Sequence, residues 1–247
     1  MLADYVRQQS TGELVRNAAT IYRRNFFTLV FPYLFVSISL AWVKLNGDIA
    51  DDPALSFVLL CVEFVLSAVI SGAATMIVSD VCLGHQPSLQ RAYRFLVGAR
   101  AWRVLGTSLL AGAMLGIGFV LFVVPAVVMY AAFITVIPVV LLEDRAGLNA
   151  ISRSYTLSRG LLLRNLGVVL ILLSPILVVT FLAVFLPELV GLLWTSAEQL
   201  FQPEIILAII QAIALPLMLI LPVLIYYDER VRKEGYDSAA LNDALRF

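Results

Sequence analysis

The lysines and arginines of this chain fall into four clusters that are separated by long apolar stretches. Of the 17 basic residues in the 247-residue sequence, only Lys44 lies outside a cluster. The clusters occupy positions 7–24, 91–103, 145–164 and 230–246. Basic loops of membrane proteins stay on the cytoplasmic side. Each of the three intervals between clusters is therefore predicted to hold two membrane crossings.

The composition indicates the same class of protein. Hydrophobic residues make up 61% of the chain, charged residues make up 14%, and the mean hydropathy is +0.95. A helix that crosses the hydrocarbon layer needs roughly 20 apolar residues. We therefore predict an all-α, polytopic membrane protein that forms one integral membrane domain over residues 1–247. The six predicted crossings are 26–43, 55–79, 104–124, 126–142, 161–186 and 205–227.

The third and fourth crossings come from one uncharged run over residues 104–142. A single helix of that length would need a tilt far beyond the usual range. A tight turn at Pro125 divides the run and keeps the next basic cluster on the same side. Six crossings place both termini in the cytoplasm, and we expect the protein in the cytoplasmic (inner) membrane. The first crossing has no cleavage pattern after it and is expected to remain as an anchor.

Three segments that precede the odd-numbered crossings mix apolar and basic residues at helical spacing. They lie at 13–25, 88–103 and 148–165, and we interpret them as amphipathic helices in the cytoplasmic headgroup layer. The chain would then consist of three units, each with one interfacial helix and one transmembrane hairpin. The alternative is that any multi-spanning protein with cytoplasmic arginines shows such patterns.

Two stretches carry a resemblance to a known family. After the fourth crossing the chain has Pro138, Glu143, Ala150, Arg153-Ser154, Leu157 and Gly160. After the sixth it has Tyr227-Asp228-Glu229-Arg230-Val231-Arg232-Lys233-Glu234-Gly235-Tyr236-Asp237. The sequence thereby resembles the bacterial six-helix family related to the membrane domain of some glycerophosphodiester phosphodiesterases and to stand-alone YciC-like proteins. The family often has Pro-Gly where this chain has Pro125-Ala126. The resemblance implies the six-helix architecture and no catalytic or binding residues.

Motifs for enzymatic chemistry are absent from the sequence. Hydrolysis in the fused relatives belongs to a soluble domain with paired histidines, and His85 is the only histidine here. The sequence has neither a His-Glu-x-x-His motif nor a phosphate-binding Gly-x(4)-Gly-Lys-Ser/Thr loop. His85 and Cys82 supply two metal ligands, which are too few for a structural zinc site. We expect no catalytic residue, metal or cofactor, and the zero net charge argues against nucleic acid as a partner.

One acidic residue, Glu63, lies well inside a predicted crossing. It begins a column of polar residues at four-residue spacing, which continues through Ser67, Ser71, Thr75 and Ser79. The column could line a cavity or a proton path, because acids inside membranes are costly and usually functional. It could also serve helix packing, since small polar residues let helices approach closely. Together with a residue of the sixth crossing it gives a candidate intramembrane polar site: Glu63, Ser67, Ser71 and Gln211.

Charged residues at the ends of two crossings suggest a cytoplasmic charge belt. The candidate members are Glu143, Asp144, Arg153, Asp228, Arg230 and Arg232. On the third crossing, Gly112 and Gly116 form a small-x-x-x-small step that favours close helix contact, within the chain or between copies. We therefore expect membrane lipids as partners, together with self-association or another membrane protein through these glycines.

Two functions fit these patterns. The first is a non-enzymatic scaffold or accessory subunit of a membrane assembly, because polar intramembrane groups are few. The second is a small transporter or lipid-handling protein with an intramembrane cavity near Glu63 and Gln211. A pocket that reaches these two residues would favour the second function, and a fully packed bundle would favour the first.

Overall fold

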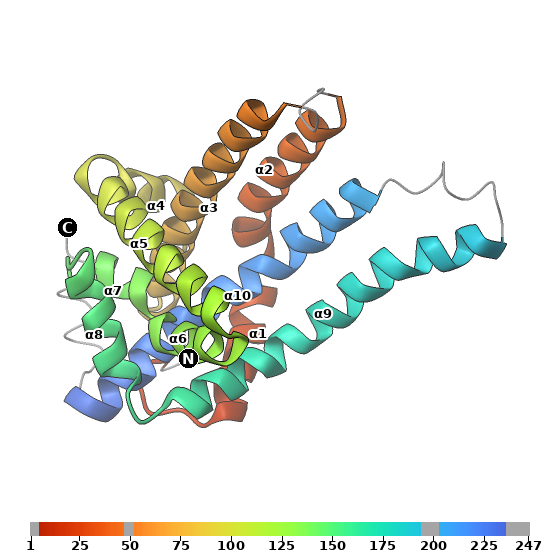
Figure 1. The fold of residues 1–247 in the computed structure, drawn as a ribbon. Coiled ribbons are helices and arrows are strands. Elements are labelled where there is room, and N and C mark those ends of the chain that lie inside the picture. Colours follow the sequence, from red (N-terminus) through yellow and green to blue (C-terminus); the bar gives the residue numbers. More distant parts are fainter. Residues whose placement is uncertain (1–4, 47–51, 194–202, 236–247) are drawn as a thin grey trace.

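A computed structural model describes residues 5–46, 52–193 and 203–235, and every regular element in these ranges is a helix (Figure 1). The helices are α1 (Thr11–Arg24), α2 (Phe26–Asn46), α3 (Pro53–Cys82), α4 (Leu89–Leu96), α5 (Ala99–Leu121), α6 (Val123–Phe133), α7 (Val136–Leu142), α8 (Leu148–Ser158), α9 (Leu162–Leu193) and α10 (Pro203–Glu234). The predicted all-α class is therefore confirmed.

Six stretches of the described chain are helical, long and apolar enough to cross a membrane. They are Phe26–Lys44, Pro53–Cys82, Ala99–Leu121, Val124–Leu142, Leu162–Leu182 and Ala212–Glu234. Five of them coincide with predicted crossings to within a few residues at each end, and the sixth both starts and ends later than predicted. The chain is a multi-pass membrane protein with six membrane-spanning segments.

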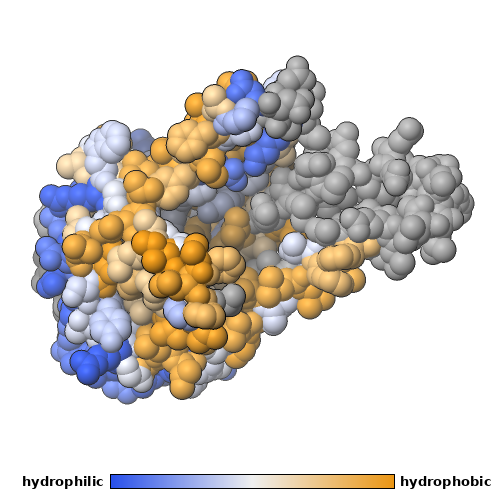
Figure 2. Space-filling view, viewed as in Figure 1, coloured by the Kyte–Doolittle hydropathy of each residue, from blue (hydrophilic) through white to orange (hydrophobic). Residues whose placement is uncertain are grey.

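The helices follow the predicted order of one short helix and then two spanning segments, three times in succession. The short helices are α1, α4 and α8. In Figure 1 the α2–α3 pair and the α9–α10 pair extend in different directions, while α7, α8 and the C-terminal part of α10 gather at the opposite end. Figure 2 shows hydrophilic residues concentrated at that end and hydrophobic residues over most of the remaining visible surface. We call it the charged end.

Two of the short helices are shorter than predicted because a glycine stops each of them. The segment 88–103 divides at Gly98, whose φ of +87° is accessible to glycine at little cost, and residues from Ala99 onward belong to α5. Likewise α8 ends at Ser158, and Gly160, with φ +85°, separates it from α9. The predicted segment 148–165 therefore contains α8 and the first turn of α9.

The first short helix, α1, lies along α10 between Ile213 and Asp228. At one end of the contact the Gln9 amide donates to Asp228 Oδ1 (2.6 Å), and at the other the Tyr22 hydroxyl donates to the Ile213 carbonyl (2.6 Å). The apolar face of α1 is buried by the protein itself, through Leu14, Ala18 and Ile21. Other helices therefore cover this face, whereas the interfacial interpretation had placed the helix along the headgroups.

The start of α1 is fixed by a capping box. Ser10 Oγ accepts from the Glu13 amide (3.3 Å), and Glu13 Oε2 accepts from the Ser10 amide (2.8 Å). Arg7 adds an ion pair of 2.6 Å to the same carboxylate. The hydrogen bond from the Ser10 amide and the contact with Arg7 lower the pKa of Glu13 to about 2. The cap is therefore intact at neutral pH and is lost only as strong acid protonates Glu13.

The turn between the third and fourth crossings lies three residues before the predicted position. The chain becomes extended at Phe122 (φ −168°, ψ 150°), and Pro125 occupies the first turn of α6, where a missing amide proton costs little. A Cβ on Gly118 would lie 2.9 Å from Met129 Sδ and 3.4 Å from Ala126 Cα. Close packing of this hairpin therefore depends on Gly118.

The two glycines of the predicted small-x-x-x-small step on α5 make no such contact. A Cβ on Gly112 or Gly116 would meet nothing within 4 Å. The predicted close approach at these positions is therefore not made within the described chain. Contact between copies stays a prediction.

The core of the protein follows α10. Seven apolar side chains between positions 220 and 227 are exposed by 1% or less, and Asp228 and Glu229 directly after them are fully buried. α2, α3 and the preceding part of α10 meet in a small cluster of Tyr33, Ile70 and Ala212. This arrangement places charged side chains inside the protein at the charged end, where they need partners.

Candidate functional site: a buried ion network and an apolar cleft

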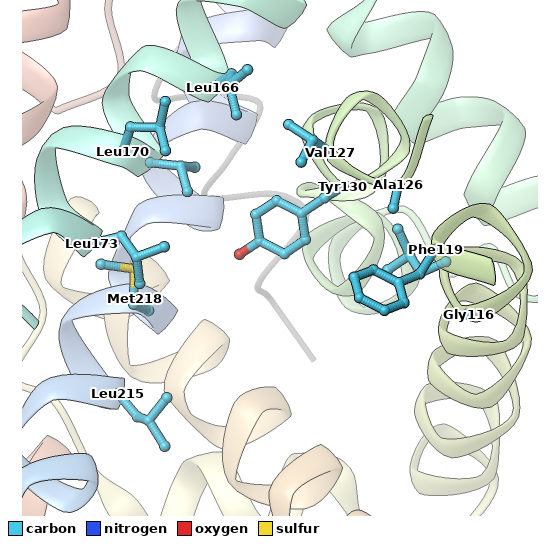
Figure 3. Close-up of a pocket in the computed structure, with 12 residues that line it drawn as sticks. Gly116, Phe119, Ala126, Val127, Tyr130, Leu166, Leu170, Leu173, Leu215 and Met218 are labelled. Atoms are coloured by element: carbon cyan, nitrogen blue, oxygen red, sulfur yellow. The ribbon is translucent and has the colours of Figure 1, made fainter. Parts of the chain in front are cut away.

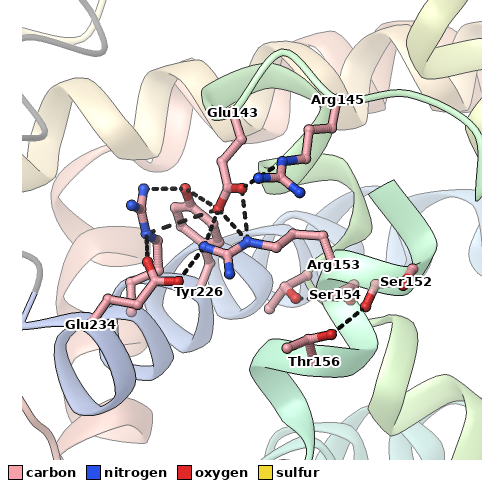
Figure 4. Close-up of polar contacts among 10 residues, drawn as sticks. Glu143, Arg145, Ser152, Arg153, Ser154, Thr156, Tyr226 and Glu234 are labelled. Atoms are coloured by element: carbon pink, nitrogen blue, oxygen red, sulfur yellow. Dashed lines mark hydrogen bonds and ion pairs between the residues drawn. The ribbon is translucent and has the colours of Figure 1, made fainter. Parts of the chain in front are cut away.

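Glu143, at the end of α7, is the centre of one ion network (Figure 4). Arg153 Nε lies 2.8 Å from Glu143 Oε2, and Arg153 Nη2 lies 3.0 Å from Oε1. Arg145 Nε approaches Oε2 to 3.2 Å, and Arg230 Nε lies 3.8 Å from Oε1. The Tyr226 hydroxyl donates to Oε1 at 3.3 Å. The carboxylate is only 9% exposed, and three arginines offset the cost of its burial.

Arg153 also reaches a second carboxylate, that of Glu234 in the last turn of α10. The distance from Arg153 Nη2 to Glu234 Oε1 is 2.5 Å, and Arg230 Nε donates to Glu234 Oε2 at 2.9 Å. Burial opposes the charge of Arg153, but the hydrogen bonds to Glu143 and Glu234 outweigh it and raise the pKa of Arg153 above its ordinary value. α7, α8 and α10 are thereby joined through alternating charges.

Asp228 is the centre of a second network, and its side chain is fully buried. Arg164 Nη2 lies 2.5 Å from Asp228 Oδ2, and Arg232 Nε donates to the same oxygen at 2.8 Å. The other oxygen accepts the Gln9 amide, while Arg232 Nη2 donates to the Gln9 carbonyl at 2.6 Å. This network attaches the segment before α1 to α9 and α10.

The predicted charge belt is therefore two buried networks and one separate pair. Asp144, directly after Glu143, pairs instead with Arg103, and its side chain is 69% exposed. Its φ of +53° turns the chain at this point, so that neighbouring carboxylates face different partners. The prediction omitted Arg145, Arg164, Tyr226 and Glu234. Of these, Glu234 could have been found, because it stands four residues after Arg230 on one helix.

Glu229, the neighbour of Asp228, is equally buried but has a different environment. Glu229 Oε1 accepts from Asn165 Nδ2 at 2.7 Å, while Oε2 has no hydrogen-bond partner among the described residues. Ser158 Oγ and Arg164 Nε also lack one. No ion pair to Glu229 occurs in the described part of the chain. We therefore expect the Glu229 carboxyl group to stabilise the charged end less than that of Asp228 does.

The polar column on α3 does not form one continuous seam. Glu63 pairs with Lys44 of α2 at 3.2 Å, both side chains being nearly half exposed, and Ser67 is exposed. Farther along, the Thr75 hydroxyl donates to the Ser71 carbonyl (3.0 Å), and Ser79 Oγ accepts from the Tyr227 hydroxyl (2.9 Å). The end of the column nearest the charged end thus serves helix packing.

Glu63 is expected to contribute little to stability. In Glu63→Gln the pair with Lys44 is lost, and exposed pairs are worth about 1 kcal/mol or less. We therefore expect a free energy of unfolding, measured by denaturant titration in detergent, within about 1 kcal/mol of wild type. Lys44→Gln is the partner control. A much larger loss for either variant would show that the pair lies in a water-free environment.

The remaining candidates from the sequence, Gln211 and the pair of Cys82 and His85, add no site. The backbone of Gln211 belongs to α10, but its side chain lies outside what the structure describes. Cys61 is exposed, Cys82 is buried, and both are free thiols. His85 Nδ1 lies 4.0 Å from Asp80 Oδ1, and no group of three metal-ligating residues occurs among the described residues.

The structure contains a cavity that the sequence did not reveal. It has a volume of about 690 Å³, opens to the outside and lies between α5, α6, α9 and α10 (Figure 3). Its walls include Gly116, Phe119, Tyr130, Leu166, Leu173 and Met218. None of its twelve lining residues is charged, and the Tyr130 hydroxyl is the only polar side-chain group among them. We call it the apolar cleft.

The predicted cavity position was different. Glu63 is not among the described residues that line the apolar cleft, and the side chain of Gln211 lies outside what the structure describes. The lining side chains are the ordinary apolar residues of membrane helices, so nothing in their type or spacing distinguishes them. The cleft results from how far α5 and α6 stand from α9 and α10, which is a property of the tertiary structure.

Comparison of the chain with protein-family models, with curated proteins and with solved structures finds no match. The resemblance described above therefore stays a prediction, and the functional argument depends on the geometry.

Proposed function

We propose that this protein is a non-enzymatic lipid-binding protein of the cytoplasmic membrane, which holds a lipid acyl chain in the apolar cleft. The observation that carries this proposal is the cleft itself, an uncharged cavity of about 690 Å³ between four membrane helices. Its volume lies in the range of ligand sites, roughly 300–1,000 Å³.

The chemistry of the walls favours an apolar occupant. All twelve lining residues belong to the spanning segments, so the cleft faces hydrocarbon rather than water. A charged ligand would find no opposite charge among them, and burial of an unpaired charge is costly. A hydrocarbon chain gains dispersion contacts with the leucines and Phe119 at no such cost.

The charged end supports a cytoplasmic orientation for both termini. Three of the four basic clusters meet there, because Arg164 and Arg232 both contact the N-terminal segment at Gln9. Basic segments are retained on the cytoplasmic side. In this orientation the exposed arginines at the end of α1, Arg23 and Arg24, are available to anionic headgroups.

A second function, that of a scaffold or accessory subunit, is favoured by one observation. Gly112 and Gly116 present an exposed surface on α5 where another helix could approach closely. Self-association or another membrane protein at this surface would make the protein part of an assembly.

The two functions can be tested with matched variants of these glycines. Gly116→Leu places a side chain at a cleft-lining position, and Gly112→Leu places the same side chain one turn earlier, at a position that does not line the cleft. We expect Gly116→Leu to lower the bound lipid per protein about tenfold, which corresponds to about 1.4 kcal/mol. Gly112→Leu should retain lipid at the wild-type level. The measurement is native mass spectrometry of protein released from detergent.

Two outcomes would contradict lipid binding in the cleft. One is wild-type protein that carries no lipid, and the other is equal lipid loss in both variants. If Gly112→Leu instead lowers the oligomeric state or removes a co-purifying protein, the scaffold function gains support.

A further inference from the structure

The Tyr130 hydroxyl is the feature of the apolar cleft that remains unexplained. In Figure 3 the ring of Tyr130 extends from α6 into the cavity, and its oxygen points away from α6. This hydroxyl makes no hydrogen bond to any described residue, although nearly all the surrounding side chains are apolar. A phenylalanine would fill the same space without a polar group.

A lone hydroxyl in apolar surroundings carries a free-energy cost unless an acceptor reaches it. In hydrocarbon no water is at hand, and an unmade hydrogen bond costs more than it would at a wet surface. A tyrosine hydroxyl in such a place normally finds a partner. The described residues offer none, and an occupant of the cleft can supply it.

We propose that the apolar cleft binds an uncharged lipid whose ester carbonyl accepts a hydrogen bond from Tyr130. This inference rests on the proposed function and adds the chemical class of the ligand. Because the walls carry no basic side chain, a phosphate or a fatty-acid carboxylate would lie there without a counter-charge. An ester carbonyl is neutral and is attached directly to the acyl chain. One diacyl lipid can therefore supply both the chain and the acceptor.

The test separates the hydrogen bond from the binding of the chain. Wild type and Tyr130→Phe are incubated with equal amounts of two uncharged glycerolipids of the same chain length, an ester-linked diacylglycerol and an ether-linked dialkylglycerol, and bound lipid is counted by native mass spectrometry. Ether lipids lack the carbonyl. We expect wild type to prefer the ester lipid about fivefold, as one net hydrogen bond allows. Tyr130→Phe should bind both equally, with total lipid unchanged.

Tyr155→Phe is the matched control, since Tyr155 is an exposed tyrosine of α8 outside the cleft. It should keep the wild-type preference. Wild type that binds both lipids equally would overturn the inference but leave lipid binding in place, and so would Tyr130→Phe that still prefers the ester lipid. Wild type that binds neither would overturn the proposed function and this inference together.

Discussion

Replacing Asp228 by asparagine is expected to lower the free energy of unfolding by about 3–5 kcal/mol, the usual loss when one member of a buried ion pair is removed. Asp228 is fully buried and joins Arg164, Arg232 and the Gln9 amide. The substitution leaves two arginines without their carboxylate. An Asn amide group would also turn a donor toward groups that are themselves donors. We expect most of the variant to be lost as misfolded protein at physiological temperature.

The adjacent residue provides a control of equal burial. Glu229→Gln changes a carboxyl group that has no ion pair among the described residues and that accepts a hydrogen bond from the Asn165 amide. Arg164 and Lys233 act on this group only at longer range, so we expect a change of about 1 kcal/mol or less, in either direction. The measurement is denaturant unfolding in detergent, together with the fraction of monodisperse protein after purification. Equal loss in both variants would refute the assignment of Asp228 as the ionic centre.

The contrast between these neighbours shows what sequence alone could and could not predict. The spans follow from hydrophobic length and from the clustering of arginines, because the bilayer imposes both, so helix positions could be predicted. Which carboxylate is paired depends on contacts between residues far apart in the chain. Asp228 meets Gln9 across 219 positions, and nothing local in either segment indicates this.

The position of the cleft was unpredictable for the same reason. Its walls come from four helices, and each helix alone looks like any other membrane span. The sequence directed attention to Glu63 because polar residues in apolar stretches are conspicuous. Its partner proved to be Lys44 on the neighbouring helix. A polar residue in an apolar stretch is therefore weak evidence for a cavity when a single ion pair already explains its presence.

The two ends of the molecule have complementary roles. Ion networks hold α7, α8, α9, α10 and the N-terminal segment together at the charged end, where burial makes each unpaired charge costly. Away from it, the hairpins diverge (Figure 1), and apolar side chains face a membrane that can solvate them. An open cleft is tolerated there because the charged end already fixes α9 and α10, two of the four helices that line it.

If the charged end has this role, Glu143→Gln should also be strongly destabilising, by about 3 kcal/mol or more. Glu143 has a nearly buried carboxylate that faces Arg153, Arg145 and Arg230. After the substitution Glu234 still pairs with Arg153 and Arg230, whereas Arg145 loses its ion pair in the described part of the chain. Asp144→Asn is the control, one residue away but with an exposed side chain and one arginine partner.

For Asp144→Asn we expect a loss of about 1 kcal/mol or less, because exposed pairs contribute little. Both variants keep the side-chain length at their positions, so the comparison isolates the charge. Denaturant unfolding in detergent gives the two free energies. Because Glu143 contacts Arg230 of α10, one of the helices that line the cleft, Glu143→Gln should also weaken ester-lipid retention, whereas Asp144→Asn should not. Equal stability of the two variants would show that the helices of the cleft are held together by apolar packing alone.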